Sequence, residues 1–269
     1  MGQECNISAL VVVYNTRCGE SPTCRALDGM EDGNLRVLIY DNSTADYGNA
    51  EYCRRRGWTY LGGQGNVGLS KAYNACIDYL ASESVTGFLC LFDDDTDLSG
   101  DYFRQLREAA AEGGHIFVPL VYSAGKLLSP CLINAGHRTR LFPDTESALT
   151  YAGDSMTAIN SGMAVDLSVF REYRYDERIF LDGVDHTFLM DMKRSGEKIH
   201  VFPYRCDHSF SGNERPPMDA AMTRFRIYAA DYRYILRGKK WAYWCLVGKR
   251  ALRLSAQYHS PAFIRELFA

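Results

Sequence analysis

The densest run of chemically competent residues lies between positions 93 and 97, where four aspartates fall within five residues. The apolar run 88–92 before them has the length of a buried strand. Since side chains alternate along an extended chain, we expect Asp93 and Asp95 to point the same way and Asp94 the other. Two adjacent carboxylates repel each other, and Mg²⁺ or Mn²⁺ bridging to substrate phosphates would offset that repulsion. The motif therefore predicts a metal-nucleotide site, with an acidic loop that caps the next helix as the simpler alternative.

Polar residues also accompany three other predicted strands, at 7–13, 35–40 and 159–165. Ligands of open α/β sheets bind beyond the carboxyl ends of the strands, so these residues are expected to form one pocket with the acidic motif. They are Tyr14, Asn15, Asp41, Asn42, Asn160 and Ser161. Asp41 and Asn42 could bind a nucleobase or ribose hydroxyls, or cap a turn or helix instead.

A glycine-rich turn at 62–68 precedes a predicted helix with helical spacing of apolar residues. Its spacing differs from the dinucleotide-binding fingerprint, so it does not indicate NAD. The turn brings Asn66 and a helix N-terminus to the same sheet edge, where an anion is stabilised. Lys71 is then either a phosphate contact or an exposed helix lysine.

Two further acids, Asp182 and Asp185, stand where another helix is predicted to begin. Either could serve only to favour the helix dipole. His208 follows at the end of the last predicted strand, and an imidazole beside carboxylates suits Mn²⁺ at least as well as Mg²⁺. We therefore predict His208 to be a metal ligand.

The order of the predicted elements indicates the fold. Strands and helices alternate over the first 120 residues or so, which favours a doubly wound α/β fold with a mostly parallel sheet and helices on both faces. Beyond Pro216-Pro217 everything reads as helical. The sequence therefore predicts a catalytic domain over 1–215 and a helical extension over 216–269.

Composition restricts the class of protein. The chain has 269 residues, 46% hydrophobic and 23% charged, as in ordinary globular proteins. The apolar run 7–13 is too short to span a bilayer, and no signal-peptide pattern opens the sequence. Nine cysteines without paired spacing suggest neither zinc nor a disulfide framework, and fit a cytoplasmic location.

The formal charge of −3 is unevenly distributed. From Arg215 onward there are eleven Lys or Arg and three acids, a charge of +8 that leaves −11 for the preceding residues. Aromatic residues interleave with these cations, which suits an anionic membrane surface or a lipid-pyrophosphate acceptor. A helical pair with a solvated basic face is the alternative. No nucleic-acid recognition motif accompanies the patch, so nucleic acid is not expected as a partner.

Several motifs occur in an order that resembles a known family. They are Val11-Val12-Val13-Tyr14-Asn15, Tyr40-Asp41-Asn42-Ser43, the run 66–74, the acidic motif, Asn160-Ser161-Gly162 and the run 180–185. Together, over about residues 7–212, they resemble the inverting family 2 glycosyltransferases of the GT-A fold, especially the rhamnosyl- and galactofuranosyltransferase-like branch.

The resemblance implies roles for these residues. Asp41 and Asn66 would line the nucleotide pocket, and Asp93 and Asp95 would be the DxD pair, with His208 as a further metal ligand. The expected substrate-binding residues are Tyr14, Asn15, Asp41, Asn42, Asn66, Gly68, Lys71, Asp93, Asp94, Asn160, Ser161 and Gly162, and the expected metal ligands are Asp93, Asp95 and His208.

The catalytic base of the family usually lies in a Glu-Asp pair at a helix start, and no such pair stands at the helix after residue 182. Counting back eleven residues from the helix-ending Gly196 puts Asp185 on the base position. Asp182 is close enough to compete for the role.

We therefore predict inverting, divalent-cation-dependent transfer of a sugar from a UDP- or dTDP-linked donor to the hydroxyl of a carbohydrate or lipid-linked acceptor. The expected setting is cell-surface polysaccharide or glycolipid synthesis, in the cytoplasm or on the inner face of the plasma membrane. The alternatives are a sugar-1-phosphate nucleotidyltransferase, which needs a basic glycine-rich loop after the first strand, and a non-catalytic nucleotide-sugar-binding module.

Overall fold

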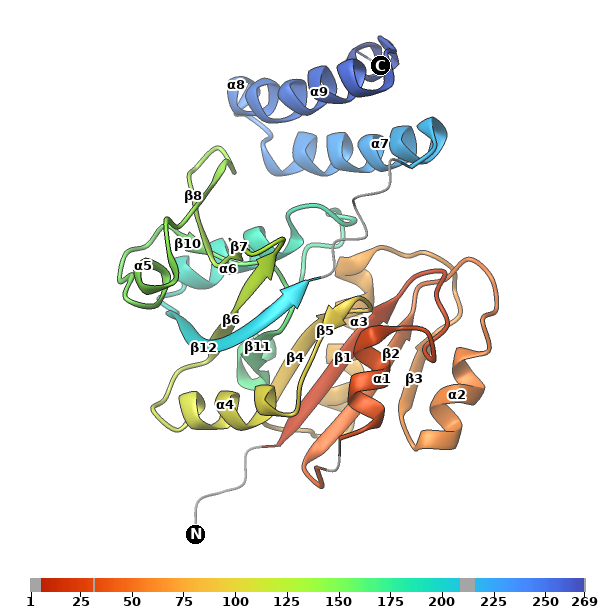
Figure 1. Ribbon diagram of the computed structural model, residues 1–269, viewed down its shortest axis with the longest axis vertical. Coiled ribbons are helices and arrows are strands. Elements are labelled where there is room, and N and C mark those ends of the chain that lie inside the picture. Colours follow the sequence, from red (N-terminus) through yellow and green to blue (C-terminus); the bar gives the residue numbers. More distant parts are fainter. Residues whose placement is uncertain (1–5, 31, 209–215, 269) are drawn as a thin grey trace.

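The computed structural model describes residues 6–30, 32–208 and 216–268 and centres on a nine-stranded sheet (Figure 1). The strands are β1 (Ile7–Val13), β2 (Leu35–Asp41), β3 (Thr59–Gly62), β4 (Phe88–Asp93), β5 (Thr96–Asp97), β6 (Ile116–Ser123), β7 (Lys126–Ser129), β8 (Cys131–Ile133), β9 (Thr139–Leu141), β10 (Met156–Thr157), β11 (Met163–Asp166) and β12 (Ile199–His208). The helices are α1 (Pro22–Asp28), α2 (Asn49–Arg56), α3 (Leu69–Ser82), α4 (Asp101–Ala110), α5 (Thr145–Leu149), η1 (Leu167–Arg171), α6 (Val184–Arg194), α7 (Met218–Ile235), α8 (Lys240–Tyr243), η3 (Trp244–Gly248), α9 (Lys249–Tyr258) and α10 (Ala262–Glu266).

The sheet is mixed but mostly parallel, with the strand order β3-β2-β1-β4-β11-β6-β12-β5 and with β7 beside β6. Strand β1 pairs in parallel with β2 and β4, and β12 pairs in parallel with β6. Strand β11 runs antiparallel between β4 and β6. The α/β class, the mostly parallel sheet and the C-terminal helices predicted from the sequence are confirmed.

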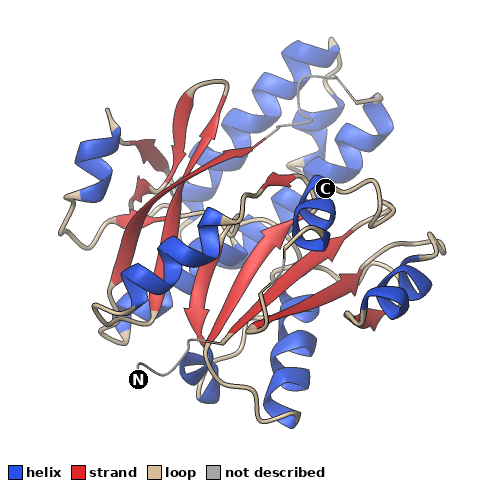
Figure 2. Cartoon of the chain, turned by 60° about the horizontal axis from the view of Figure 1, so that its bottom comes forward, coloured by secondary structure: helices blue, strands red, loops and turns tan. Residues whose placement is uncertain are grey.

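Helices cover both faces of the sheet (Figure 2). Along β1, Ala9 and Val11 pack on the face covered by α1, α2 and α4, whereas Leu10 packs on the face covered by α3 and α6. Because both faces are buried, the strands need apolar side chains at consecutive positions, which explains the unbroken apolar runs in the sequence.

One strand prediction was wrong in extent. The strand predicted at 159–165 begins only at Met163, because Gly162 takes a φ of +79° and Met163 N–H turns back to donate to Asn160 O at 2.9 Å. The last strand ends at His208, where the sequence places its end, after a register shift between Val201 and Arg205.

Helices α7 to α10, with α8, η3 and α9 running on as one segment, form a bundle with its own core, built around Phe225, Val247 and Phe263. In Figure 1, α7 lies between the sheet domain and the α8–α9 segment. Among the residues described, none of the helices is both long and apolar enough to cross a bilayer.

Candidate active site

The acidic motif forms a turn between β4 and β5 that α1 holds in place. Ser21 Oγ donates to Asp94 O at 2.5 Å, and Thr23 Oγ1 donates to Asp93 O at 2.6 Å. Thr23 Oγ1 also accepts from Thr96 N at 2.9 Å. Because Ser21 and Thr23 are buried, these hydrogen bonds are shielded from water and fix the path of the turn.

This turn overturns the expected alternation of the aspartates. Asp93 and Asp94 both line one cavity, although strict alternation along a strand would point them to opposite sides. The reason is that residues 94 and 95 form a turn and are not an extended continuation of β4. The rule that side chains alternate applies only as far as the strand extends.

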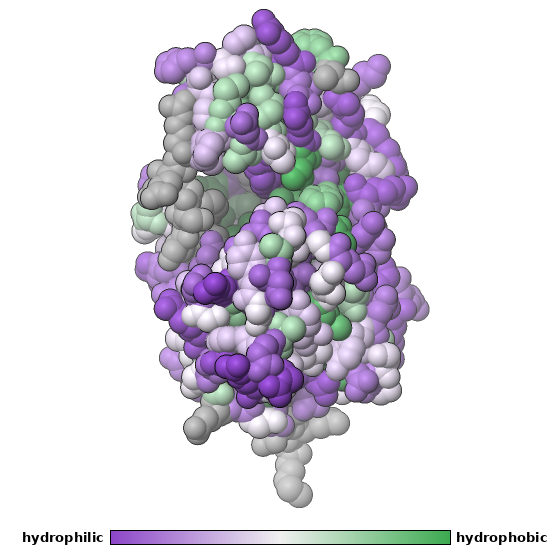
Figure 3. Space-filling view, turned by 90° about the vertical axis from the view of Figure 1, so that its right-hand side faces the viewer, coloured by the Kyte–Doolittle hydropathy of each residue, from purple (hydrophilic) through white to green (hydrophobic). Residues whose placement is uncertain are grey.

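The cavity lies between the carboxyl edge of the sheet and α7 and has a volume of about 570 Å³, a size typical of small-molecule sites. It is lined by Val12, Tyr14, Asn42, Asn66, Gly68, Leu69, Asp93, Asp94, Phe180, Leu181, Ala220, Thr223, Arg224 and Ile227. Figure 3 shows a hollow between the helical extension, at the top, and the sheet domain below it. The extension therefore forms one wall of the cavity.

Besides Asp93 and Asp94, four of the predicted substrate-binding residues line this cavity, namely Tyr14, Asn42, Asn66 and Gly68. Tyr14 is 50% exposed at its edge. Asn42 Oδ1 accepts from Val67 N at 2.8 Å and so ties the strand end to the glycine-rich turn that carries Asn66. Gly68 has a φ of +87°, and a Cβ there would lie 2.8 Å from Phe180 O, so only glycine permits this close approach.

Asn15 and Asp41 lie outside the cavity lining and brace the loops behind it. Asn15 Oδ1 accepts from Thr44 N at 2.9 Å. Asp41 is 5% exposed, and its carboxylate accepts from Ser43 N at 3.0 Å and from Asn49 Nδ2 at 2.9 Å. With these bonds in place, Asp41 shapes the loop beside the cavity.

Of the predicted residues that precede β11, Ser161 contacts Asp93 directly, and Asn160 and Gly162 hold the same turn in place. The Ser161 hydroxyl donates to the Asp93 carboxylate, and Asn160 Nδ2 donates to Tyr73 OH at 3.1 Å. Gly162 N donates to Leu91 O at 2.8 Å and joins this turn to β4. Lys71, in contrast, is exposed on α3 and is not among the lining residues.

Asp185 and Asp182 have different surroundings. Asp185 stands in the first turn of α6, with its side chain 18% exposed and its Oδ1 accepting from His186 N at 2.7 Å. Burial raises its pKa, and the charges of Asp93 and Asp182 raise it further, while His186 opposes the shift. Asp185 is therefore a carboxyl with a raised pKa, a property that functional carboxylates often show.

Asp182 is committed to an ion pair. Arg224 of α7 donates to both of its carboxylate oxygens, with Nη2 and Oδ1 2.8 Å apart. Arg250 Nη1 lies 4.0 Å from the same Oδ1. A carboxylate held by a bidentate guanidinium is poorly suited to accept a substrate proton. The geometry thus favours Asp185 over Asp182.

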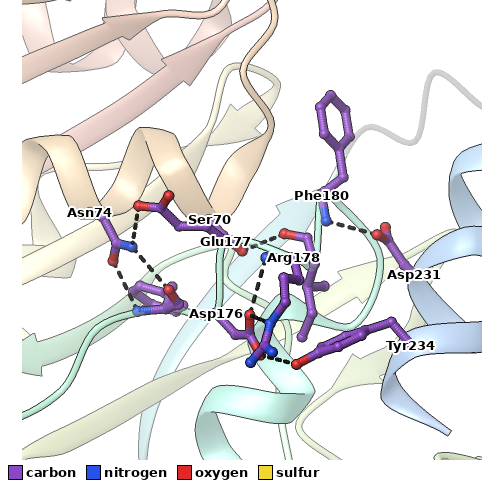
Figure 4. A network of polar contacts seen from close by, with 10 residues as sticks. Ser70, Asn74, Asp176, Glu177, Arg178, Phe180, Asp231 and Tyr234 are labelled. Carbon is purple, nitrogen blue, oxygen red and sulfur yellow. Dashed lines mark hydrogen bonds and ion pairs between the residues drawn. The ribbon is translucent and has the colours of Figure 1, made fainter. Parts of the chain in front are cut away.

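Asp231 of α7 is an important residue that the sequence did not reveal. It is 2% exposed and accepts hydrogen bonds from three consecutive backbone amides, Phe180 N at 2.7 Å, Leu181 N at 2.9 Å and Asp182 N at 2.8 Å. Figure 4 shows it pointing from α7 to the loop that leads to Asp185. The available signal was an acid in a strongly basic segment, where it would otherwise be read as a solvated charge.

The other side of this loop is tied to α3 (Figure 4). Ser70 Oγ donates to Ile179 O at 2.6 Å, and Asn74 both donates to Tyr175 O and accepts from Tyr175 N, each at 2.9 Å. The first residues of the run 66–74 therefore line the cavity. Its later residues, Ser70 and Asn74, hold the loop that precedes Asp185.

The fit of a divalent cation can be tested on the acidic turn. Burial, followed by the charges of Asp95 and Asp93, raises the pKa of Asp94 to about 6. A cation would relieve this repulsion, and carboxylate oxygens are ligands that Mg²⁺ and Mn²⁺ accept. His208 pairs through its backbone with Thr96, and its side chain lies outside the described residues. The described part of the chain contains no cluster of three or more potential ligands among His, Cys, Asp and Glu.

No family model and no curated protein matches this sequence. Solved structures do match. A mannosyltransferase from Pyrobaculum calidifontis, in complex with GDP-Man and Mn²⁺, matches over 99% of this chain and 79% of its own, with a TM-score of 0.58 and 13% identity. The chain has a GT-A-like fold.

Two further structures agree. S. aureus TarS matches with a TM-score of 0.56 and 14% identity over 84% of this chain and 39% of its own. Glucosyl-3-phosphoglycerate synthase from Mycobacterium tuberculosis, with Mn²⁺, UDP and glucosyl-3-phosphoglycerate, matches with a TM-score of 0.55 and 13% identity. The match covers 84% of this chain and 78% of the synthase. This chain thus spans well under half of TarS, and 65% of its 1–349 fragment. At such low identities the likeness establishes the fold alone.

The Asp231 contacts lead to a stability prediction. Asp231→Ala leaves three backbone N–H groups without their acceptor, so we expect it to lower the free energy of unfolding by about 3 kcal/mol. Asp219→Ala is the matched control, because Asp219 lies exposed in the first turn of the same helix and should change stability by less than about 0.5 kcal/mol. Urea unfolding measures both, and equal stabilities for the two variants would contradict the assigned role.

Proposed function

We propose that the protein is an inverting, metal-dependent glycosyltransferase that moves a sugar from a UDP- or dTDP-linked donor to an acceptor hydroxyl. The observation that carries this proposal is the neighbourhood of Asp93 and Asp185. Asp93 lines a cavity of small-molecule size at the carboxyl edge of the sheet, and its charge contributes to the raised pKa of Asp185, whose side chain is 18% exposed. A cation-binding carboxylate and a general base are the two groups that direct displacement of a nucleoside diphosphate requires.

In this proposal Asp185 accepts the proton of the acceptor hydroxyl. The acceptor oxygen then forms a bond to the anomeric carbon while the bond from that carbon to the diphosphate oxygen breaks, with inversion of configuration. Tyr14, Asn42 and Asn66 would hold the nucleotide, and Ser161 keeps the carboxylate of Asp93 oriented. A divalent cation held by Asp93 and Asp95 would neutralise the charge that develops on the departing diphosphate.

The matched structures support the proposal through the ligands named for them, GDP-Man with Mn²⁺ in one and UDP with Mn²⁺ in another. Both of these pair a nucleotide or nucleotide sugar with a divalent cation on a similar fold. The rhamnosyl- and galactofuranosyltransferase-like branch, and a place in cell-surface polysaccharide or glycolipid synthesis, remain inferences from the sequence motifs.

The products of the reaction test the proposal against its alternatives. Incubation with a panel of UDP-, dTDP- and GDP-sugars and Mn²⁺ should release nucleoside diphosphate from one of them. Release of pyrophosphate from a nucleoside triphosphate and a sugar 1-phosphate would instead identify a nucleotidyltransferase. Donor binding with neither product, even with candidate acceptors, would indicate a binding module.

The helical extension supports the proposed membrane-surface location of the acceptor. Trp241 is 80% exposed, Phe268 76% and Leu252 62%, and they stand among exposed cations such as Lys240 and Arg253. Interfacial aromatic residues beside cations bind anionic lipid headgroups.

We therefore expect the protein to float with anionic vesicles at low salt and not with neutral ones. The double variant Trp241→Ser/Phe268→Ser should lose most of this association, whereas Leu141→Ser, which removes an exposed apolar residue of the sheet domain on β9, should retain it. Equal flotation with both vesicle types would leave the extension as a structural bundle with a solvated basic face.

A further inference from the structure

A second, smaller cavity lies at the junction of α6, the end of α7 and the loop between β8 and β9. Its volume is about 220 Å³. Its lining includes Thr187 and Arg194 from α6, Arg237 and Lys239 from the segment after α7, and His137 from the loop. It shares none of its lining residues with the donor cavity.

Two cationic side chains of the lining, Arg237 and Lys239, are available to bind an anion. The lining carboxylates are already paired, Asp191 with Arg194 Nη1 at 2.7 Å and Asp176 with Arg178 Nε at 2.8 Å. Arg237 and Lys239 form no ion pair with a carboxylate in the described part of the chain. Arg237 stacks on Tyr234 with its Cζ 4.7 Å from the ring centroid, and Lys239 Nζ donates one hydrogen bond to Ala135 O at 2.9 Å.

Two polar atoms of the lining are also unsatisfied. His137 is 7% exposed, and within residues 6–30, 32–208 and 216–268 its Nδ1 has no hydrogen-bond partner. The same is true of Thr187 Oγ1. Buried polar atoms without partners are costly, and a bound ligand is one of the few ways to satisfy them.

The electrostatic potential at His137 points to the sign of that ligand. Burial lowers the pKa of His137 to about 4, and electrostatic interactions with His186, Lys239 and Arg194 contribute to the shift. The imidazole is therefore neutral at pH 7 in a positive environment that an anion would compensate.

We propose that this cavity is a binding site for a phosphate group, either free phosphate or the phosphoryl group of a small metabolite, held by Arg237, Lys239 and His137. A tetrahedral oxyanion fits its volume, matches its two available cations and accepts hydrogen bonds from Thr187 and the imidazole. The site lies along α6, the helix that carries Asp185 in its first turn, but it does not depend on the proposed transfer reaction.

Calorimetric titration of the full chain at pH 7 and constant ionic strength tests the site, with inorganic phosphate in one arm and glycerol 3-phosphate in the other. Arg237→Gln and Lys239→Gln should each weaken binding about tenfold, because each removes a charged hydrogen-bond donor. Lys240→Gln is the matched control, since this exposed neighbour lies outside the lining and should leave the affinity unchanged. The tighter ligand of the two arms identifies the source of the phosphate group.

The titration is repeated with UDP and Mn²⁺ saturating the donor cavity, where phosphate binding should persist. Loss of the binding signal under these conditions would assign it to the donor cavity and overturn the proposal. It is equally overturned if phosphate fails to bind, or if the two lining variants bind as tightly as the unmodified protein while their melting temperatures confirm that they are folded.

Discussion

Replacing Asp185 by asparagine is expected to lower the rate of sugar transfer by about a hundred- to ten-thousand-fold, the usual contribution of a general base. The amide keeps the size of the carboxylate and its hydrogen bond from His186 N, which lies 2.7 Å from Oδ1. It cannot accept a proton from the acceptor hydroxyl at neutral pH. Donor and cation should still bind, because Asp93 and Asp95 are unchanged.

Asp182→Asn separates the two candidate bases. This substitution weakens the ion pair with Arg224 and should reduce stability and loosen the wall formed by α7, with a smaller loss of rate. Asp101→Asn controls for removal of a carboxylate from a first helical turn, because Asp101 begins the remote helix α4. A nearly normal Asp185→Asn enzyme beside an inactive Asp182→Asn enzyme would move the base three residues earlier. Near-normal transfer by both would refute the mechanism.

The same assignment predicts the pH dependence of transfer. A general base works only when deprotonated, so the rate should rise with pH through the pKa of Asp185. Because burial raises that pKa above 3.8, the acidic limb should lie at higher pH than for an exposed aspartate. A pH profile of kcat/KM measures the limb. In the Asp185→Asn variant this limb should disappear from the residual rate.

The second large effect is expected at the acidic turn, where Asp93→Asn or Asp95→Asn should abolish Mn²⁺-dependent binding of nucleoside diphosphate. At a ligand concentration of about a hundred times Kd, binding stabilises the folded protein by about 2.7 kcal/mol. For a chain of this size that corresponds to a rise in Tm of about 5 °C or more. Thermal unfolding with UDP, with and without Mn²⁺, should show this rise in the unmodified protein and not in the two variants.

Asp97→Asn is the matched control, since Asp97 belongs to the same motif but is exposed on β5 and does not line the cavity. It should retain the full Mn²⁺-dependent shift. His208→Ala extends the test to the residue whose side chain the structure does not describe, and should weaken the shift as well. An undiminished shift in both Asp93→Asn and Asp95→Asn would show that the turn does not hold the cation.

Local patterns in the sequence were sufficient to predict several buried strands and the sheet edge at which the pocket lies. The apolar runs identified β1, β2 and β4 to within a residue or so, because strands buried on both faces must be apolar at consecutive positions. The carboxyl ends of parallel strands meet at one edge, and this rule alone brought Tyr14, Asn42 and Asp93 into one predicted pocket.

Only the tertiary structure decided which acids are available for chemistry. The sequence placed Asp185 on the base position but left Asp182 as a competitor. The two differ in the structure because Arg224, more than forty positions later, packs against Asp182. In the same way the Asp41 carboxylate accepts a hydrogen bond from Asn49, and Asp94 joins Asp93 in the cavity lining because the chain turns after β4.

The part played by the helical extension was equally invisible in the sequence. Its charge predicted a separate partner, yet Asp231 and Arg224 bind the loop that leads to Asp185, and Arg224 also lines the cavity. Strand and helix periodicity depends on neighbours along the chain, so it can be read from residues in order. Ion pairs and amide-carboxylate contacts depend on neighbours in space. Those neighbours are far apart in the sequence, so they are known only from the folded structure.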